Sequence, residues 1–213
     1  MKKFIFAIVA IIVCTMSFDA TAQSNKALQK AQKKEYKAKM REYKKGGWEI
    51  FGSSHTLNTV LLTHYEELSK EGVSEISATA ESTSKNIGRD KLFMNACTYY
   101  ARESGSIVKG RIVEDLGSII TPEEATEFEH FYEAFESAVE KEIKGELKLS
   151  YTVFRQIKKG ETDIYEFEAL FLVDEEAATQ ARIRAFENAA RESEVAQKYA
   201  ERVSEFINKG LQK

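Results

Sequence analysis

The sequence predicts an α+β fold: a single antiparallel or mixed sheet of about five strands, with helices mainly on one face, preceded by a basic N-terminal helix. The main observation is a predicted β-hairpin over residues 146–173, where apolar and polar residues alternate on both sides of a turn at 158–161. Its second strand ends in the continuous apolar run Leu170, Phe171, Leu172 and Val173, which indicates a central strand buried on both faces. Segments of helical periodicity precede and follow the hairpin.

The chain before the hairpin alternates between predicted helices and strands. Residues 24–45 are rich in Ala, Lys, Gln and Glu, which favour a helix, and Gly46 and Gly47 end it. We then expect a strand at 48–51, a helix at 55–71, an outer strand at 73–80 and a helix at 89–103 that Ser104 and Gly105 end. A strand at 107–113 follows, with Gly110 as a possible bulge.

Two more helices are indicated by their first residues. Thr121 precedes Pro122 and is followed by Glu124 at the capping-box position, so a helix begins there and carries an aromatic stripe. Asp174 can cap a helix that runs to about residue 208 with a break near 191–194.

The first 22 residues have the pattern of a signal peptide. Lys2 and Lys3 precede an apolar run at 4–13, and small residues at Ala20 and Ala22 fit a signal-peptidase site. We expect cleavage after Ala22, export to the periplasm or outer envelope of a Gram-negative bacterium, and no transmembrane span afterwards. The alternatives are a retained anchor, for which the apolar run is short, and lipidation of Cys14, which lacks the small residue that a lipobox requires just before its Cys. The predicted organisation is a signal peptide at 1–22, a basic helical arm at 23–45 and one α+β domain at 46–213.

Charge divides the mature chain into two parts. Residues 24–45 contain nine Lys and Arg against two Glu, whereas residues 46–213 contain 20 Lys and Arg against 31 Asp and Glu. The basic arm suits an anionic envelope surface or an acidic protein face, and its alternative is a solvated helix that keeps the N-terminus soluble. Nucleic acid is not expected as a partner of an exported chain with an acidic domain. The predicted partner-binding residues are Lys30, Lys33, Lys34, Lys37, Arg41, Arg89 and Arg111. The last two belong to a basic cluster around 89–111 whose alternative role is to protect a sheet edge.

No catalytic motif or cofactor fingerprint occurs, so neither an enzyme nor a cofactor or metal site is predicted. His130 between Glu127 and Glu133 is the best metal candidate, and its alternative is a solvated surface residue. His55 beside two serines is interpreted as the start of a helix, and His64 as a histidine at the edge of the core. Cys97 lies on an apolar stripe, and without Cys14 the chain has no second cysteine for an intramolecular disulfide.

Three features of the sequence resemble known proteins. The helix at 91–101, the segment after it and the hairpin ending at Asp174 resemble the small-lipoprotein domain of the twenty-kilodalton surface lipoprotein family and of the flagellar T-ring protein's N-terminal domain. The chain as a whole resembles secreted envelope proteins of Gram-negative anaerobes in which Gly-Trp, Gly-Ser-Ser and Lys-Gly-Glu-Leu segments recur in order, here at 47–48, 52–54 and 144–147. The resemblance implies an envelope-associated, non-catalytic α+β domain and brings no site residues.

The expected function is therefore a non-catalytic exported envelope protein that acts as a structural or partner-binding module, with an envelope protein, an anionic surface or a second copy as partner. One alternative is an exported hydrolase of cell-wall or host glycans, which would need two carboxylates facing each other across a cleft. The other is a carrier of a small apolar ligand, with the aromatic stripe at 128–135 lining its pocket.

Overall fold

A computed structural model of the chain describes residues 30–208. The predicted signal peptide, Cys14 and the cleavage site after Ala22 lie outside the described residues. The chain divides into two compact units, Met1–Gly47 and Trp48–Lys213. In the first unit, residues 30–45 are helical as expected, and the chain leaves the helix through Gly46, whose N–H donates to the Glu42 carbonyl at 2.8 Å.

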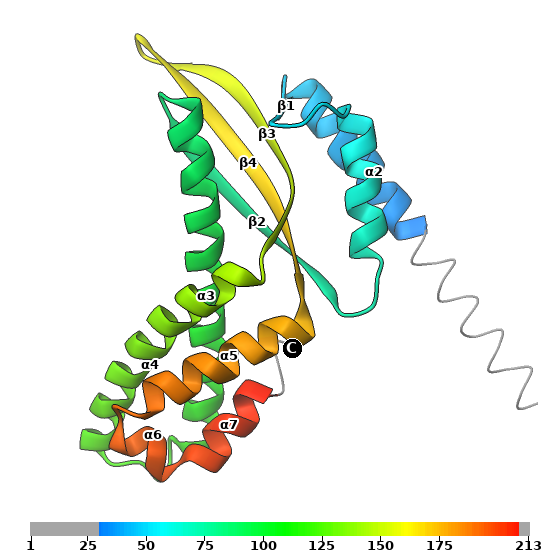
Figure 1. Ribbon diagram of the computed structural model, residues 1–213. Helices are drawn as coiled ribbons and strands as arrows, with labels where there is room; N and C mark the ends of the chain where they lie inside the picture. Colours follow the sequence, from blue (N-terminus) through cyan, green and yellow to red (C-terminus); the bar gives the residue numbers. More distant parts are fainter. Residues whose placement is uncertain (1–29, 209–213) are drawn as a thin grey trace, which may run out of the picture. The chain divides into compact units, whose positions relative to one another are not determined.

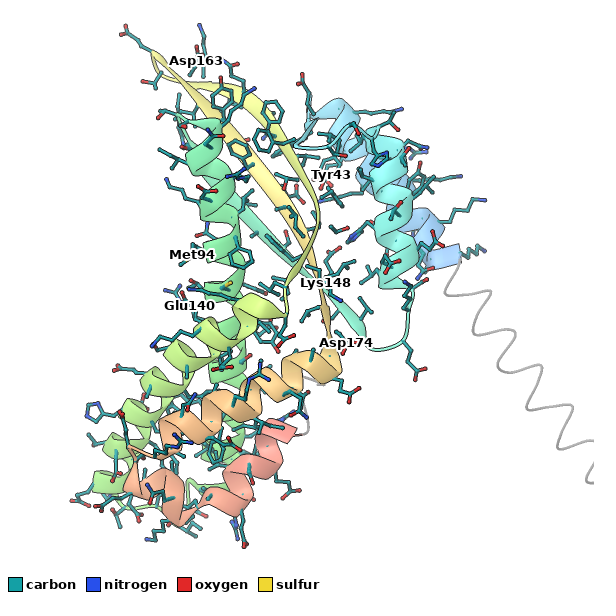
Figure 2. The ribbon with its side chains drawn as sticks, viewed as in Figure 1. Tyr43, Met94, Glu140, Lys148, Asp163 and Asp174 are labelled. Carbon is teal, nitrogen blue, oxygen red and sulfur yellow. The ribbon has the colours of Figure 1, made fainter. Side chains whose placement is uncertain are left out.

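The second unit is built on one antiparallel sheet of four strands in the order β1-β3-β4-β2 (Figure 1). The strands are β1 (Glu49–Phe51), β2 (Val73–Ser82), β3 (Lys148–Lys159) and β4 (Thr162–Asp174). The predicted hairpin is confirmed as β3 and β4, and Gly160 has a φ of 66° in the turn between them, a conformation that glycine adopts without strain. Figure 2 shows Asp163 at the tip of this hairpin and Asp174 where β4 ends.

Strand β4 is central and buried on both faces, as its apolar run predicts. Its side chains alternate between two faces. The face that packs against α3 (Lys85–Leu116) is called the α3 face, and it contains Ala80, Phe167, Ala169 and Phe171. Gly88 of α3 makes the closest approach, because a Cβ atom there would overlap the Phe167 ring. The opposite face, called the α2 face, contains Glu168, Leu170 and Leu172.

The predicted fifth strand at 107–113 is wrong, and so is the bulge at Gly110. These residues continue α3, which runs without a break for 32 residues. Val108, Ile112 and Leu116 are buried at helical spacing, four residues apart, and pack into the core. Gly105, which was expected to end the helix, instead lies where α3 meets Glu136 of α4. Tertiary packing along the whole helix therefore outweighs the local effect of its glycines.

The other helices begin where the sequence indicates. α4 (Pro122–Glu142) has the predicted capping box: Thr121 Oγ1 accepts from the Glu124 N–H at 3.2 Å, and the Glu124 carboxylate accepts from the Thr121 N–H at 2.9 Å. Asp174 caps α5 (Glu175–Ala190), and the expected break separates α5 from α6 (Glu194–Lys198) and α7 (Ala200–Asn208). A 3-10 turn, η1 (Ile143–Gly145), leads from α4 to the hairpin.

Helices contact both faces of the sheet, but mainly the α3 face, in line with the expected arrangement mainly on one face. The N-terminal part of α3 covers one face, while α2 (Leu57–Leu68) contacts β2 and β3 from the other. Within the second unit, α4, α5, α6 and α7 gather around the C-terminal part of α3, away from most of the sheet (Figure 1). Within residues 30–208, no helix combines the length and the apolar character needed to cross a membrane.

Candidate functional site

Strand β2 is an outer strand of the sheet, and its outer edge carries backbone groups that β4 does not use. The Gly72 carbonyl accepts from Glu175 on the β4 side, whereas the carbonyls of Thr79 and Glu81 accept from α3 side chains on the outer side. Because successive residues of a strand alternate, the odd-numbered residues of β2 direct their N–H and C=O groups outward. Within residues 30–208, the backbone groups of Glu75 and Ser77 that face outward have no protein partner.

Two side chains of α3 cover the far end of this edge. Asn95 Nδ2 donates to the Thr79 carbonyl at 2.7 Å, and Lys91 Nζ donates to the Glu81 carbonyl at 3.3 Å. Each donor atom stands where the N–H of a neighbouring strand would lie. Lys91 thus has the edge-protecting role that was the alternative for the basic cluster around 89–111.

A pocket lies at each end of the edge. The lower pocket, of about 380 Å³, lies against Gly72, the start of β2, α3 and the beginning of α5, and its lining includes Tyr100, Glu103 and Glu175. The upper pocket, of about 680 Å³, lies where β2 and β4 run beside Lys91 and Asn95. Its lining includes Trp48 and the carboxylates of Glu81, Glu166 and Glu168. We call the β2 edge with its two pockets the edge groove.

Arg182 of α5 supports the lower pocket from inside the protein. Its side chain is 1% exposed, and its Nη1 donates to the hydroxyl of Tyr100 on α3. Its Nη2 donates to Glu175 at 2.7 Å and to Thr179 at 2.6 Å. Burial raises the pKa of Tyr100, so the phenol stays protonated at neutral pH. This network fixes two of the residues that line the lower pocket.

His64 of α2 joins three elements on the α2 face. Its imidazole is 1% exposed, its Nε2 lies 2.5 Å from the Glu75 carboxylate, and its Nδ1 lies 2.9 Å from the Ser150 hydroxyl. Ser150 is the extra residue of a β-bulge between Leu149 and Tyr151, which turns its side chain toward α2. The sequence predicted a histidine at the edge of the core, but it predicted neither of the two polar partners of His64.

The same three side chains form a Ser–His–Glu array, and Ser150 lines a pocket of about 320 Å³. In serine hydrolases the nucleophile contacts Nε2 and the carboxylate contacts Nδ1, which is the reverse of the order in this protein. An imidazole held this way orients α2 on β2 and β3. We expect the array to stabilise the fold, and labelling of Ser150 would show whether it also has chemistry.

The predicted basic residues of the arm lie on one side of its helix. Lys30, Lys33, Lys34, Lys37 and Arg41 are all exposed, and their positions recur at three, four, seven and eleven residues, the spacing of one helical face. Lys44 and Lys45 extend this set, which we call the basic face. Glu42 lies on another side and forms an ion pair with Lys39. A concentrated positive face is the feature that binds anionic surfaces.

The two predicted partner residues of α3 do not join a shared surface. Arg89 is exposed and pairs with its neighbour Asp90 at 2.9 Å. Arg111 lies 22 residues further along the same helix, about 33 Å away along its axis. Its Nη1 donates to the Phe206 carbonyl at 2.5 Å, so this arginine fixes α7 on α3.

The structure gives other roles to the remaining candidates from the sequence. Glu127 accepts from the Val195 N–H at 2.9 Å at the start of α6, so it is engaged away from the exposed His130. His55 precedes α2 and its N–H donates to Ser53. Cys97 is buried, and desolvation raises the pKa of its thiol to about 11, which keeps it in the unreactive thiol form. Within residues 30–208, no group of three or more His, Cys, Asp or Glu is arranged to hold a metal ion.

The two alternative functions, a carrier of a small apolar ligand and a glycan hydrolase, would need a pocket lined by the α4 aromatics and a pair of carboxylates across a cleft. The aromatic side chains of α4 are buried and pack on one another and on Phe186 and Tyr199, so they form core. The upper pocket does hold three carboxylates, but Glu81 is the register partner of Glu166 and both lie on the α2 face. They are neighbours on one surface and not a pair across a cleft. Lys159 pairs with Glu81 and Arg155 with Glu166, each at 2.6 Å.

No family model, curated protein or solved structure matches this chain. The resemblance to the surface lipoprotein and T-ring domains therefore stays a prediction. Sequence reasoning placed β2 but missed the edge groove. Its only signal was the alternation of exposed Glu75, Ser77, Thr79 and Glu81 with buried apolar residues in the predicted outer strand.

Proposed function

We propose that this protein is a non-catalytic, exported partner-binding module of the cell envelope, and that its edge groove binds an extended segment of another polypeptide as an added strand. The outward backbone groups of Glu75 and Ser77, which have no partner within the described residues, carry this proposal. An added strand would satisfy them, because main-chain hydrogen bonds give affinity in strand addition while side-chain pockets give selectivity. The pockets at both ends of the edge would supply the selectivity.

The basic face has a separate part in the proposed function. It would hold the protein at an anionic envelope surface while the acidic domain binds its partner, in line with the charge division of the sequence. The signal-peptide pattern supports export.

The side chains of Asn95 and Lys91 cover two carbonyls of the β2 edge. A partner strand would displace them and bind these carbonyls in their place.

The strand-addition proposal is tested with random peptides displayed on phage and the mature chain, residues 23–213. We expect the protein to enrich binders, and each binder to slow amide hydrogen exchange at Glu75 and Ser77. The amides of Ile76 and Ala78 are internal controls, because they face β4 and are protected in the free protein. Enriched peptides that leave the two outward amides unchanged would contradict the proposal.

A second comparison uses protein variants. Ser77→Pro removes an outward donor without removing a bond to β4, and proline is tolerated at edge strands, so binding should fall at least tenfold while the fold is kept. Asn95→Ala should raise affinity about two- to tenfold, because the partner no longer displaces a side-chain hydrogen bond. Unchanged binding by both variants would place the binding surface elsewhere.

The arm is tested with vesicles. We expect the mature chain to co-sediment with phosphatidylglycerol vesicles and not with phosphatidylcholine vesicles. The triple variant Lys33→Gln, Lys37→Gln, Arg41→Gln should lose roughly 100-fold in affinity, because each basic residue near an anionic surface contributes about 1 kcal/mol at moderate salt. The matched control removes three exposed charges from the second unit: Lys141→Gln, Lys148→Gln, Lys158→Gln. Equal losses for both variants would show that net charge acts and the basic face does not.

A further inference from the structure

We propose that the segment bound at the edge groove turns one basic and one bulky apolar side chain toward α3, where Glu103 and Tyr99 meet them. This inference rests on the proposed strand addition and adds the chemistry of the partner. It follows from a row of α3 side chains that runs beside the β2 edge.

Asn95, Tyr99 and Glu103 follow one another at four-residue steps along α3, so they lie on one side of the helix. Two contacts place this row at the β2 edge: Asn95 donates to the Thr79 carbonyl, and Glu103 lines the lower pocket. Tyr99 lies between these two residues and is 55% exposed. A strand added beside β2 would run along the row, and its side chains on the α3 face would contact it.

Glu103 differs from the other two carboxylates of the lower pocket in its charge environment. Glu75 lies beside His64 on the α2 face. Glu175 forms an ion pair with Arg182. Glu103 is half-buried, and within residues 30–208 it has no ion pair and no side-chain hydrogen bond. Among the described residues, those that line this pocket include no Lys or Arg. A basic side chain of the partner would therefore supply the missing positive charge.

Tyr99 offers the partner an apolar contact one helical turn from Glu103. Tyrosine is enriched among the interface residues that contribute most to binding, because a partner covers a large ring at a low cost in side-chain entropy. The step from Tyr99 to Glu103 along α3 is about 6 Å, and neighbouring side chains on one face of a strand are about 7 Å apart. A basic residue at Glu103 therefore places the next side chain of the same face on Tyr99.

The test uses a synthetic peptide of Thr and Ser, matched in length to β2, with a central lysine and a leucine two residues to either side of it. One leucine can then reach Tyr99 whichever way the strand runs. We expect this peptide to bind the mature chain and to slow amide exchange at Glu75 and Ser77. Replacement of the lysine by glutamate should weaken binding about fivefold, and so should replacement of both leucines by threonine.

Protein variants assign the two effects to their residues. Glu103→Lys should reverse the charge preference and bind the glutamate peptide about fivefold more tightly than the lysine peptide. Tyr99→Ala should lose the preference for leucine over threonine, whereas Tyr99→Phe keeps the ring and should keep the preference. The controls Glu187→Lys and Val113→Ala change exposed residues that line neither pocket, and both preferences should persist in them.

Equal affinity for the lysine and glutamate peptides, with the Glu75 and Ser77 amides still protected, would overturn this inference and leave strand addition in place. A loss in Tyr99→Ala that is the same for the leucine and threonine peptides would do so as well. No protection by these peptides or by the phage-selected binders would overturn strand addition itself. Protection that grows with protein concentration in the absence of peptide would identify a second copy as the occupant and overturn the inference.

Discussion

Replacement of Arg182 by methionine is expected to lower the free energy of unfolding by about 3 kcal/mol. The arginine is 1% exposed, and its guanidinium group bonds Tyr100 on α3 as well as Glu175 and Thr179 on its own helix. Methionine fills the volume but leaves the Tyr100 hydroxyl without its donor and Glu175 without its cation. Removal of one member of a buried polar network leaves the others desolvated and unpaired, which costs more than the network itself contributes.

Urea unfolding followed by circular dichroism measures this effect, and Arg184 provides the control. Arg184 lies two residues further along α5 and pairs with Glu142 and Glu146, but its side chain is 45% exposed. Arg184→Met should therefore cost between zero and about 1 kcal/mol. The loss of unfolding free energy in Arg182→Lys should lie between those of the two methionine variants, because an ammonium group cannot reach Tyr100 and Glu175 in the same forked geometry. Equal losses at positions 182 and 184 would show that the buried network does not hold α5 on α3.

Replacement of His64 by alanine is also expected to cost about 3 kcal/mol. The change removes a buried ring that packs edge-on against Tyr65 and Tyr151, with centroids 5.2 Å apart in each pair. It also removes the hydrogen bonds to Glu75 and Ser150, which join α2 to β2 and β3. We expect the loss to be accompanied by faster amide exchange in α2, because these contacts fix the helix on the sheet.

His55→Ala is the control, since His55 is exposed before the start of α2, and it should change stability by less than about 0.5 kcal/mol. The same preparations test the chemistry of the Ser–His–Glu array. A fluorophosphonate probe that labelled Ser150 in the wild-type protein and failed to label the His64→Ala variant would identify an activated serine and contradict the non-catalytic assignment. A stability loss at position 64 without any labelling is the expected result.

Much of the local structure follows from the sequence because its causes are local. The alternation on both sides of Gly160 predicted the hairpin, and the run from Leu170 to Val173 predicted that β4 is central. Thr121, Pro122 and Glu124 predicted the start of α4 by their capping chemistry. Lys33, Lys37 and Arg41 share a face simply because helical spacing brings such positions together. Each of these features depends on residues close together in the chain.

The predictions that were wrong concern features that depend on residues far apart in the chain. Gly105 and Gly110 indicated a helix end and a strand bulge, yet α3 continues through both because α4 and α7 pack along it. Arg111 looked like a surface cation until α7, 95 residues later in the chain, supplied its acceptor.

The sequence by itself thus determined the α+β class, the hairpin, the helix caps and the division of charge, all of which arise from neighbouring residues. Only the tertiary structure decided that Asn95 and Lys91 cover part of the β2 edge, that Arg182 supports a pocket beside it and that His64 meets Glu75 and Ser150. These pairings depend on which distant segments come together. That choice is made by burial of the whole core, a property that no short stretch of sequence contains.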